Sequence, residues 1–176
     1  VRDQMYTYLL DTYKENDLTY DSFNKGKLES QLAYDGNYKA YFEFIADSLK
    51  RYSSQRDKQK GEAFVHGFTL AMTSQNQFYR PISELDNDGG YADIFLSPLC
   101  DIYKDMVDSY IIELKYCKTN TADEQLQVLF KEASAQICRY ANSDIVKESV
   151  KTTKLHKLVV IYRGAEMVMC EEVTEE

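Results

Sequence analysis

An acid and a base interrupt an apolar, strand-like segment of the chain. Within residues 110–116, Glu113 and Lys115 are two positions apart. Successive side chains of a strand point to opposite faces, so these two side chains share one face. Keeping both charges among apolar neighbours is costly unless they are paired, hydrated or bound to a metal. This cost is a reason to expect a functional site here.

A second strand-like segment supplies another acid. Asp93 is the one carboxylate of residues 91–96, which follow a turn-rich stretch at residues 86–90. If the two strands pair, Asp93 and Glu113 converge and repel each other unless a cation lies between them. Oxygen ligands of this kind suit Mg²⁺ or Mn²⁺. Such a metal lowers the pKa of bound water and neutralises charge on a phosphate, while Lys115 can orient the water or stabilise the transition state.

The elements that must position these residues follow from the apolar spacing. Residues 110–116, 91–96 and 78–82 are predicted strands, preceded by a mostly apolar helix over residues 62–72 that we expect to be a core helix. A helix is predicted over 122–141, and its apolar stripe comprises Leu126, Leu129, Phe130, Ala133, Ile137 and Tyr140. Two strands, residues 155–162 and 167–172, close the chain around a turn at Arg163 and Gly164.

The first third of the chain is predicted to be helical. One helix is indicated by Met5, Tyr8, Leu9 and Tyr13, and a second by Tyr38, Tyr41, Phe42, Ile45, Ala46 and Leu49. The polar run at residues 53–61 then breaks the pattern. We therefore predict a helical lead over residues 1–60 and one main domain over residues 61–176.

The order and spacing of these motifs resemble the PD-(D/E)XK nuclease superfamily. The resemblance is carried by Ala92-Asp93, by Glu113-Leu114-Lys115 about twenty residues later, and by a preceding helix with its own acid. One bacterial branch of this superfamily has similar sequences at three places: the glycine-rich turn before Asp93 and the segments 62–67 and 135–140. In that branch the nuclease domain follows an AAA-ATPase-like domain, and residues 1–13 look like the segment that leaves it.

The resemblance implies an α/β, restriction-endonuclease-like fold with a mixed central sheet flanked by helices. It also implies Mg²⁺- or Mn²⁺-dependent hydrolysis of phosphodiester bonds, in DNA rather than RNA. Matched position by position, Asp93, Glu113 and the backbone carbonyl of Leu114 hold the metal, Lys115 is the active-site lysine, and Glu62 and Gln136 are auxiliary residues. Ala92 replaces the proline of the motif's name, at a position that varies widely in the superfamily.

Each of these assignments has a plainer alternative. Glu113 and Lys115 could be a structural ion pair, with Asp93 an acid of the preceding turn. Glu62 and His66 are one helical turn apart and could be a hydrated acid and a histidine at the edge of the core. Gln136 is a polar residue among apolar neighbours, so its side-chain amide is expected to have a hydrogen-bond partner, in the site or elsewhere. The whole domain could also be a non-catalytic module that binds a partner or regulates an ATPase-like neighbour.

Charge and composition limit the partners. The 176 residues carry a formal charge of −8, so tight binding to nucleic acid by this chain alone is not expected. Lys147, Lys151 and Lys154 would align on a helix, as a solvated face or as a guide for nucleic acid.

The four scattered cysteines suggest reduced, mostly buried thiols. We expect a soluble, cytoplasmic protein without a membrane span.

Overall fold

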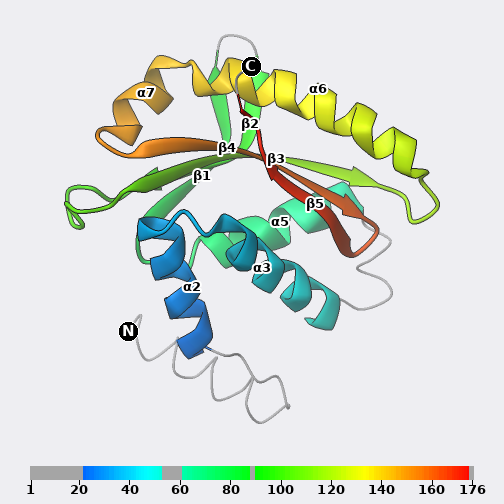
Figure 1. Ribbon diagram of the computed structural model, residues 1–176, viewed down its shortest axis with the longest axis horizontal. Helices are drawn as coiled ribbons and strands as arrows, with labels where there is room; N and C mark the ends of the chain where they lie inside the picture. Colours follow the sequence, from blue (N-terminus) through cyan, green and yellow to red (C-terminus); the bar gives the residue numbers. More distant parts are fainter. Residues whose placement is uncertain (1–21, 53–60, 88–89, 175–176) are drawn as a thin grey trace.

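The computed structural model describes residues 22–52, 61–87 and 90–174 (Figure 1). The helices are α2 (Ser22–Tyr34), α3 (Tyr38–Tyr52), α5 (Glu62–Thr73), α6 (Asp123–Ala141) and α7 (Asp144–Val150). The strands are β1 (Tyr79–Asn87), β2 (Gly90–Pro98), β3 (Asp108–Cys117), β4 (Lys154–Arg163) and β5 (Glu166–Glu172). The predicted order of helix, three strands, helix and two strands is confirmed, and α2 and α7 add to it.

One mixed sheet forms the centre of the molecule. Its strand order is β1-β2-β3-β4-β5, with β3 and β4 parallel and every other neighbouring pair antiparallel. Parallel strands are covered on both faces and therefore have nearly continuous apolar sequences. β3 follows this rule except at its first two residues, Asp108 and Ser109, and at the charged pair Glu113 and Lys115. The charges thus lie on a central strand rather than at an exposed edge.

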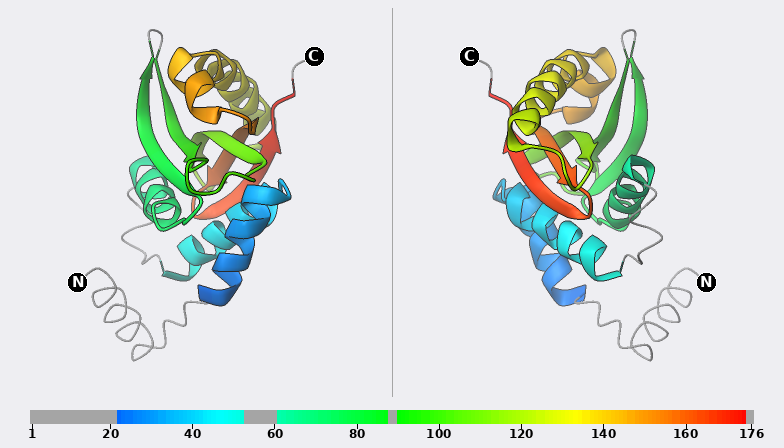
Figure 2. Two further views of the ribbon diagram at one scale, coloured as in Figure 1. Left: turned by 90° about the vertical axis from the view of Figure 1, so that its left-hand side faces the viewer. Right: turned by 90° about the vertical axis from the view of Figure 1, so that its right-hand side faces the viewer.

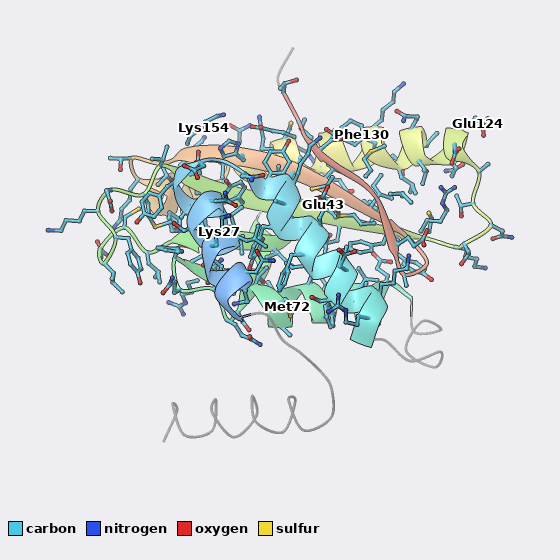
Figure 3. All side chains as sticks on the ribbon, turned by 60° about the horizontal axis from the view of Figure 1, so that its bottom comes forward. Lys27, Glu43, Met72, Glu124, Phe130 and Lys154 are labelled. Atoms are coloured by element: carbon cyan, nitrogen blue, oxygen red, sulfur yellow. The ribbon has the colours of Figure 1, made fainter. Side chains whose placement is uncertain are left out.

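Helices cover both faces of the sheet (Figures 1 and 2). α2, α3 and α5 pack on one face, and α6 with α7 packs on the other. Figure 3 shows the same division, with Met72 of α5 and Glu43 of α3 on the side opposite Phe130 of α6. Each face has its own apolar core, the larger one beneath α2, α3 and α5. This three-layer α/β arrangement confirms the predicted restriction-endonuclease-like fold class.

The helical spacing in the sequence predicted which faces are buried, with one exception. The apolar stripes of α3 and α6 are buried or half-buried as expected. Residues 62–72 form the predicted helix, but it is a core helix along one face only. α5 buries Val65, Thr69 and Met72, whereas Ala63, Gly67 and Ala71 are exposed. Small apolar residues cost little when they face water, so composition overstated the burial of this helix.

The predicted alignment of three lysines on one helix is also wrong. α7 ends at Val150, and Lys151 has a φ of 50°, which takes the chain out of the helix. Lys154 already belongs to β4, and the Lys151 Nζ lies 2.6 Å from Asp101 Oδ1. These lysines therefore do not form one basic row.

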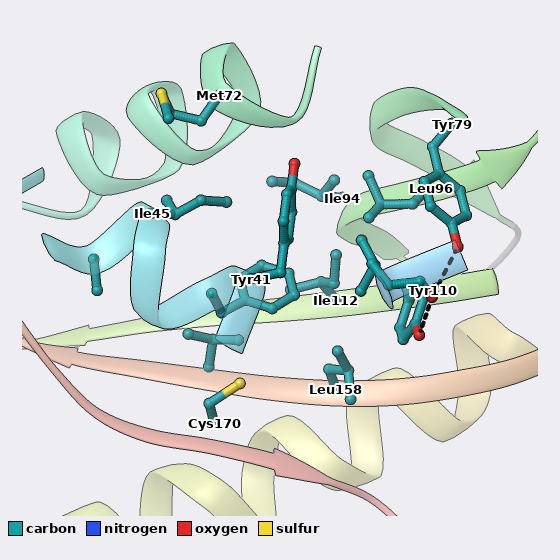
Figure 4. Packing of buried hydrophobic residues seen from close by; sticks show 14 of the residues in the cluster. Tyr41, Ile45, Met72, Tyr79, Ile94, Leu96, Tyr110, Ile112, Leu158 and Cys170 are labelled. Atoms are coloured by element: carbon teal, nitrogen blue, oxygen red, sulfur yellow. Dashed lines mark hydrogen bonds between the residues drawn. The ribbon is translucent and has the colours of Figure 1, made fainter. Parts of the chain in front are cut away.

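The α2 helix is joined to the sheet by a hydrogen bond from a buried tyrosine. The Tyr110 hydroxyl donates to the Leu32 carbonyl at 2.7 Å (Figure 4). The Tyr79 hydroxyl lies 3.3 Å from the same carbonyl oxygen, but its shorter hydrogen bond, at 2.8 Å, is to the Asp108 carbonyl. The carbonyls of the last helical turn lack intrahelical partners, so the Tyr110 phenol satisfies one that would otherwise be buried alone. Leu28, Leu32 and Ala33 of α2 share a core with β3 and β4.

Replacing Tyr110 with Phe is expected to lower the free energy of unfolding by about 1 kcal/mol, because a buried hydrogen bond is lost while the ring is kept. Urea denaturation followed by circular dichroism would measure this. Tyr103→Phe, at a half-buried ring that packs on Phe78, is the matched control. An equal loss in both variants would contradict the role given to the Tyr110 hydroxyl.

The predicted helix at residues 5–13 and the polar run at residues 53–60 lie outside the described residues. On either side of that run, α3 and α5 pack into the same core. A boundary at residue 60 stays a prediction. None of the helices within the described ranges is long and apolar enough to cross a membrane.

Candidate active site

Glu113 and Lys115 meet on one face of β3. The Lys115 Nζ donates to the Glu113 Oε1 at 2.9 Å. The Glu113 side chain is only 3% exposed and the Lys115 side chain 20% exposed. The alternation of a strand therefore brings the two groups together as the sequence predicts, with the acid buried and the amine at the surface of the site.

Asp93 reaches the same place from β2. The pairing of β2 with β3 covers Leu96 to Ile94, and a continued register would place Asp93 opposite Glu113. Instead, the Asp93 Oδ2 accepts a hydrogen bond from the Leu114 N–H at 2.8 Å. A carboxylate thus takes the place of a backbone partner where the strands cease to pair, and two acids converge beside Lys115.

Burial, together with the nearby charge of Asp93, raises the pKa of Glu113 to about 7. The hydrogen bond and charge of Lys115 lower it and compensate only in part. A weaker contribution from the Asp93 N–H also lowers the pKa of Glu113. Burial likewise raises the pKa of Asp93, against the Leu114 N–H and the charges of His66 and Lys115. Both acids are held in surroundings that disfavour their charged forms.

Lys115 remains a cation in this site. Burial alone would lower the pKa of its amine, but the hydrogen bond and charge of Glu113, with the charges of Asp93 and Glu62, outweigh burial and raise it. Lys115 is therefore suited to stabilise negative charge rather than to accept a proton at neutral pH.

The two predicted auxiliary residues differ in their relation to this centre. Glu62 is exposed in the first turn of α5, and its charge acts on both Asp93 and Lys115. Gln136 is half-buried on α6 and makes no hydrogen bond to Asp93, Glu113 or Lys115 in the described part of the chain. The roles given to both residues stay predictions.

His66 is closer to the centre than its sequence context indicated. Its Nε2 lies 3.1 Å from the Asp93 carbonyl oxygen and 3.4 Å from the Ser83 Oγ. The only signal in the sequence was its position one helical turn after Glu62. Because every residue has a backbone carbonyl, a contact with one cannot be predicted from the residue types.

The donor atoms fit a divalent cation that prefers oxygen. The Glu113 Oε2 is buried without a hydrogen-bond partner, which is costly for a carboxylate unless another group contacts it. The Leu114 carbonyl faces the same neighbouring strand as the Leu114 N–H, since both groups of a strand residue point to one side. Asp93, Glu113 and Leu114 thus offer oxygen ligands suited to Mg²⁺ or Mn²⁺.

Other kinds of metal site are not seen in the described ranges. They contain no group of three or more His, Cys, Asp and Glu side chains that could hold a metal. All four cysteines are free; Cys117 and Cys170 are buried, and Cys100 and Cys138 are half-buried. Two carboxylates and one carbonyl would leave coordination positions for water, as Mg²⁺ usually requires.

The fold and this constellation define an α/β protein whose central mixed sheet brings two acids and a lysine to one point. Comparison with protein families agrees, because the model of the PD-(D/E)XK nuclease superfamily matches residues 60–172. The chain belongs to this superfamily. No curated protein and no solved structure shows significant similarity to it.

Proposed function

We propose that the protein is a Mg²⁺-dependent nuclease that hydrolyses phosphodiester bonds in DNA. The observation that carries the proposal is the convergence of Asp93 and Glu113 beside Lys115, with one buried Glu113 oxygen left without a partner. Within a nuclease superfamily, such a centre has the charges that phosphodiester hydrolysis requires. A structural ion pair alone would not account for the unpaired oxygen.

Each residue has a distinct part in this reaction. Asp93, Glu113 and the Leu114 carbonyl would hold the cation, which when bound supplies an activated water and neutralises charge on the phosphate. Asp93 keeps its orientation through the Leu114 N–H. The Lys115 ammonium stabilises the negative charge that develops on the phosphate oxygens and helps to orient the attacking water. Glu62, which is exposed, would help to keep the Lys115 amine charged, because its own negative charge raises the pKa of that amine.

The net charge limits how the substrate is held. At −8 the chain can offer few phosphate contacts, so binding to DNA should be weak and should weaken further with salt. We propose that an upstream ATPase-like domain in the full-length protein supplies additional contacts. We propose DNA rather than RNA as the substrate because of the family resemblance alone. A cleavage assay on both polymers tests this choice.

Millimolar Mn²⁺ is expected to raise the melting temperature of the intact protein. A cation that binds only the folded state at tenfold excess over its Kd adds about 1.4 kcal/mol, which corresponds to roughly 3–6 °C for a chain of this size. Thermal melts with Mn²⁺ and with EDTA would measure the shift. Asp93→Ala should abolish it, so an equal shift in that variant would contradict a site at Asp93.

Cleavage of plasmid and single-stranded DNA with Mg²⁺ or Mn²⁺ tests the activity itself. Salt-sensitive cleavage that requires the cation supports the proposal. If the chain cleaves nothing either alone or with its natural neighbouring domain restored, the protein is a non-catalytic module instead.

A further inference from the structure

Asp93 lies at an irregular point of β2. Ile94 packs in the core beneath α2, α3 and α5, whereas Ala92 packs in the opposite core. Residues two apart in a regular strand share a face, so the alternation breaks at Asp93. The pairing with β3 also stops at Ile94. β2 stays paired with β1 on both sides of Asp93, through the pairs of Ser83 with Ile94 and of Leu85 with Ala92. On the β3 side, contacts other than strand pairing must hold the backbone that carries this carboxylate.

One of these contacts comes from the helix α5. The His66 Nε2 lies 3.1 Å from the Asp93 carbonyl oxygen. A carbonyl can only accept a hydrogen bond, so this contact requires a hydrogen on Nε2. The Ser83 Oγ, 3.4 Å from the same nitrogen, can then only share that hydrogen as a second acceptor. The imidazole thus joins α5 to the backbone of β2 through one defined donor.

The two hydrogen bonds at Asp93 act on different parts of the residue. The Leu114 N–H holds the carboxylate at 2.8 Å, and the His66 ring holds the carbonyl. With both ends fixed, the second carboxylate oxygen of Asp93 is held in one direction. Without the His66 contact, the peptide at Asp93 would be held only by the flanking pairs with β1, and the carboxylate could turn away from the shared centre.

We propose that His66 is a positioning residue, whose Nε2–H fixes the Asp93 backbone and thereby aims the Asp93 carboxylate at the metal position. This inference rests on the function proposed above. His66 acts through Asp93 and contacts neither substrate nor metal. Removal of outer contacts that orient a metal ligand typically weakens metal binding by about 10- to 100-fold.

A pair of amide substitutions separates this role from simple packing. In His66→Gln the side-chain amide nitrogen can occupy the place of Nε2 and donate to the Asp93 carbonyl. In His66→Asn the amide is one carbon shorter and cannot reach it. We expect Mn²⁺ affinity within about threefold of wild type in the Gln variant and at least about tenfold weaker in the Asn variant.

The Mn²⁺ dissociation constant is measured on the intact chain by electron paramagnetic resonance, with the melting temperature in EDTA as a control for folding. Asp93→Ala gives the value for a lost ligand, and Ser83→Ala is the matched control beside the ring. Cleavage by the Asn variant should fall at low Mn²⁺ and recover at saturating Mn²⁺, since the reacting groups are unchanged.

The outcomes distinguish this inference from the function on which it rests. If Gln and Asn variants have equal Mn²⁺ affinity, whether normal or weakened, the hydrogen bond does not position Asp93 and only this inference is overturned. If wild type binds no Mn²⁺ and Asp93→Ala is indistinguishable from it, both the inference and the proposed nuclease site are overturned.

Discussion

Replacing Lys115 with Ala is expected to lower the rate of DNA cleavage by about two orders of magnitude or more, while Mn²⁺ binding is retained. The Lys115 Nζ contacts the Glu113 Oε1 and is not itself a possible metal ligand, since an ammonium group has no lone pair to donate. Replacing Glu113 with Ala should abolish both cleavage and metal binding.

The reason is that Lys115 keeps its charge. Glu113, Asp93 and Glu62 together raise the pKa of the amine despite its burial, so Lys115 keeps a full positive charge beside the position proposed for the phosphate. A fixed charge in a site with little water stabilises a developing anion more strongly than it would in bulk solvent. The effect of Lys115→Ala should therefore appear in kcat rather than in KM.

Single-turnover cleavage at saturating Mn²⁺ measures this effect. Lys118→Ala is the matched control, because Lys118 is an exposed lysine just after the end of the same strand. Its cleavage should match wild type. Unchanged cleavage in Lys115→Ala would instead identify a contaminating nuclease as the source of the activity.

The sequence predicted those elements whose side chains alternate or repeat cleanly. In β3 a period of two brought Glu113 and Lys115 to one face, and in α6 the spacing of Leu126, Ala133 and Ile137 marked the buried side. The pattern of α2 was hidden. Lys25 and Glu29 are buried there as an ion pair among the apolar residues, so charge no longer distinguishes the outer face.

The centre of the site was predictable in its residues but not in its contacts. That Asp93 and Glu113 converge follows from two neighbouring strands. The hydrogen bond from the Leu114 N–H to Asp93 depends on where β2 and β3 stop pairing, which the sequence does not encode locally. The same holds for His66, whose partner is a carbonyl that every residue possesses.

The second large effect concerns stability. Replacing Glu113 with Gln is expected to make the metal-free protein more stable above neutral pH, although it removes the proposed activity. Burial and the charge of Asp93 raise the pKa of Glu113 from 4.5 to about 7 in the folded protein. The folded state therefore binds this proton more tightly than the unfolded state does.

The sign of the pH dependence follows from this difference. Between about pH 4.5 and 7 the unfolded state loses the proton first, so the free energy of unfolding falls as the pH rises. Below this range Glu113 carries its proton in both states and its ionisation costs nothing. Above it the full cost applies, at most roughly 3 kcal/mol for a group that is 3% exposed. A neutral Gln does not carry this cost.

Urea denaturation in EDTA at about pH 4 and about pH 8 would measure the effect, because the titration of Glu113 falls between these values. We expect wild type and Glu113→Gln to differ little at the lower pH and by up to about 3 kcal/mol, in favour of Gln, at the higher pH. Glu132→Gln, at an exposed position of α6, controls for the change in net charge. Addition of Mn²⁺ should stabilise wild type and leave the Gln variant almost unchanged. A Gln variant that is less stable than wild type at the higher pH in EDTA would mean that Lys115 already compensates the buried charge, and that Glu113 serves as half of a structural ion pair.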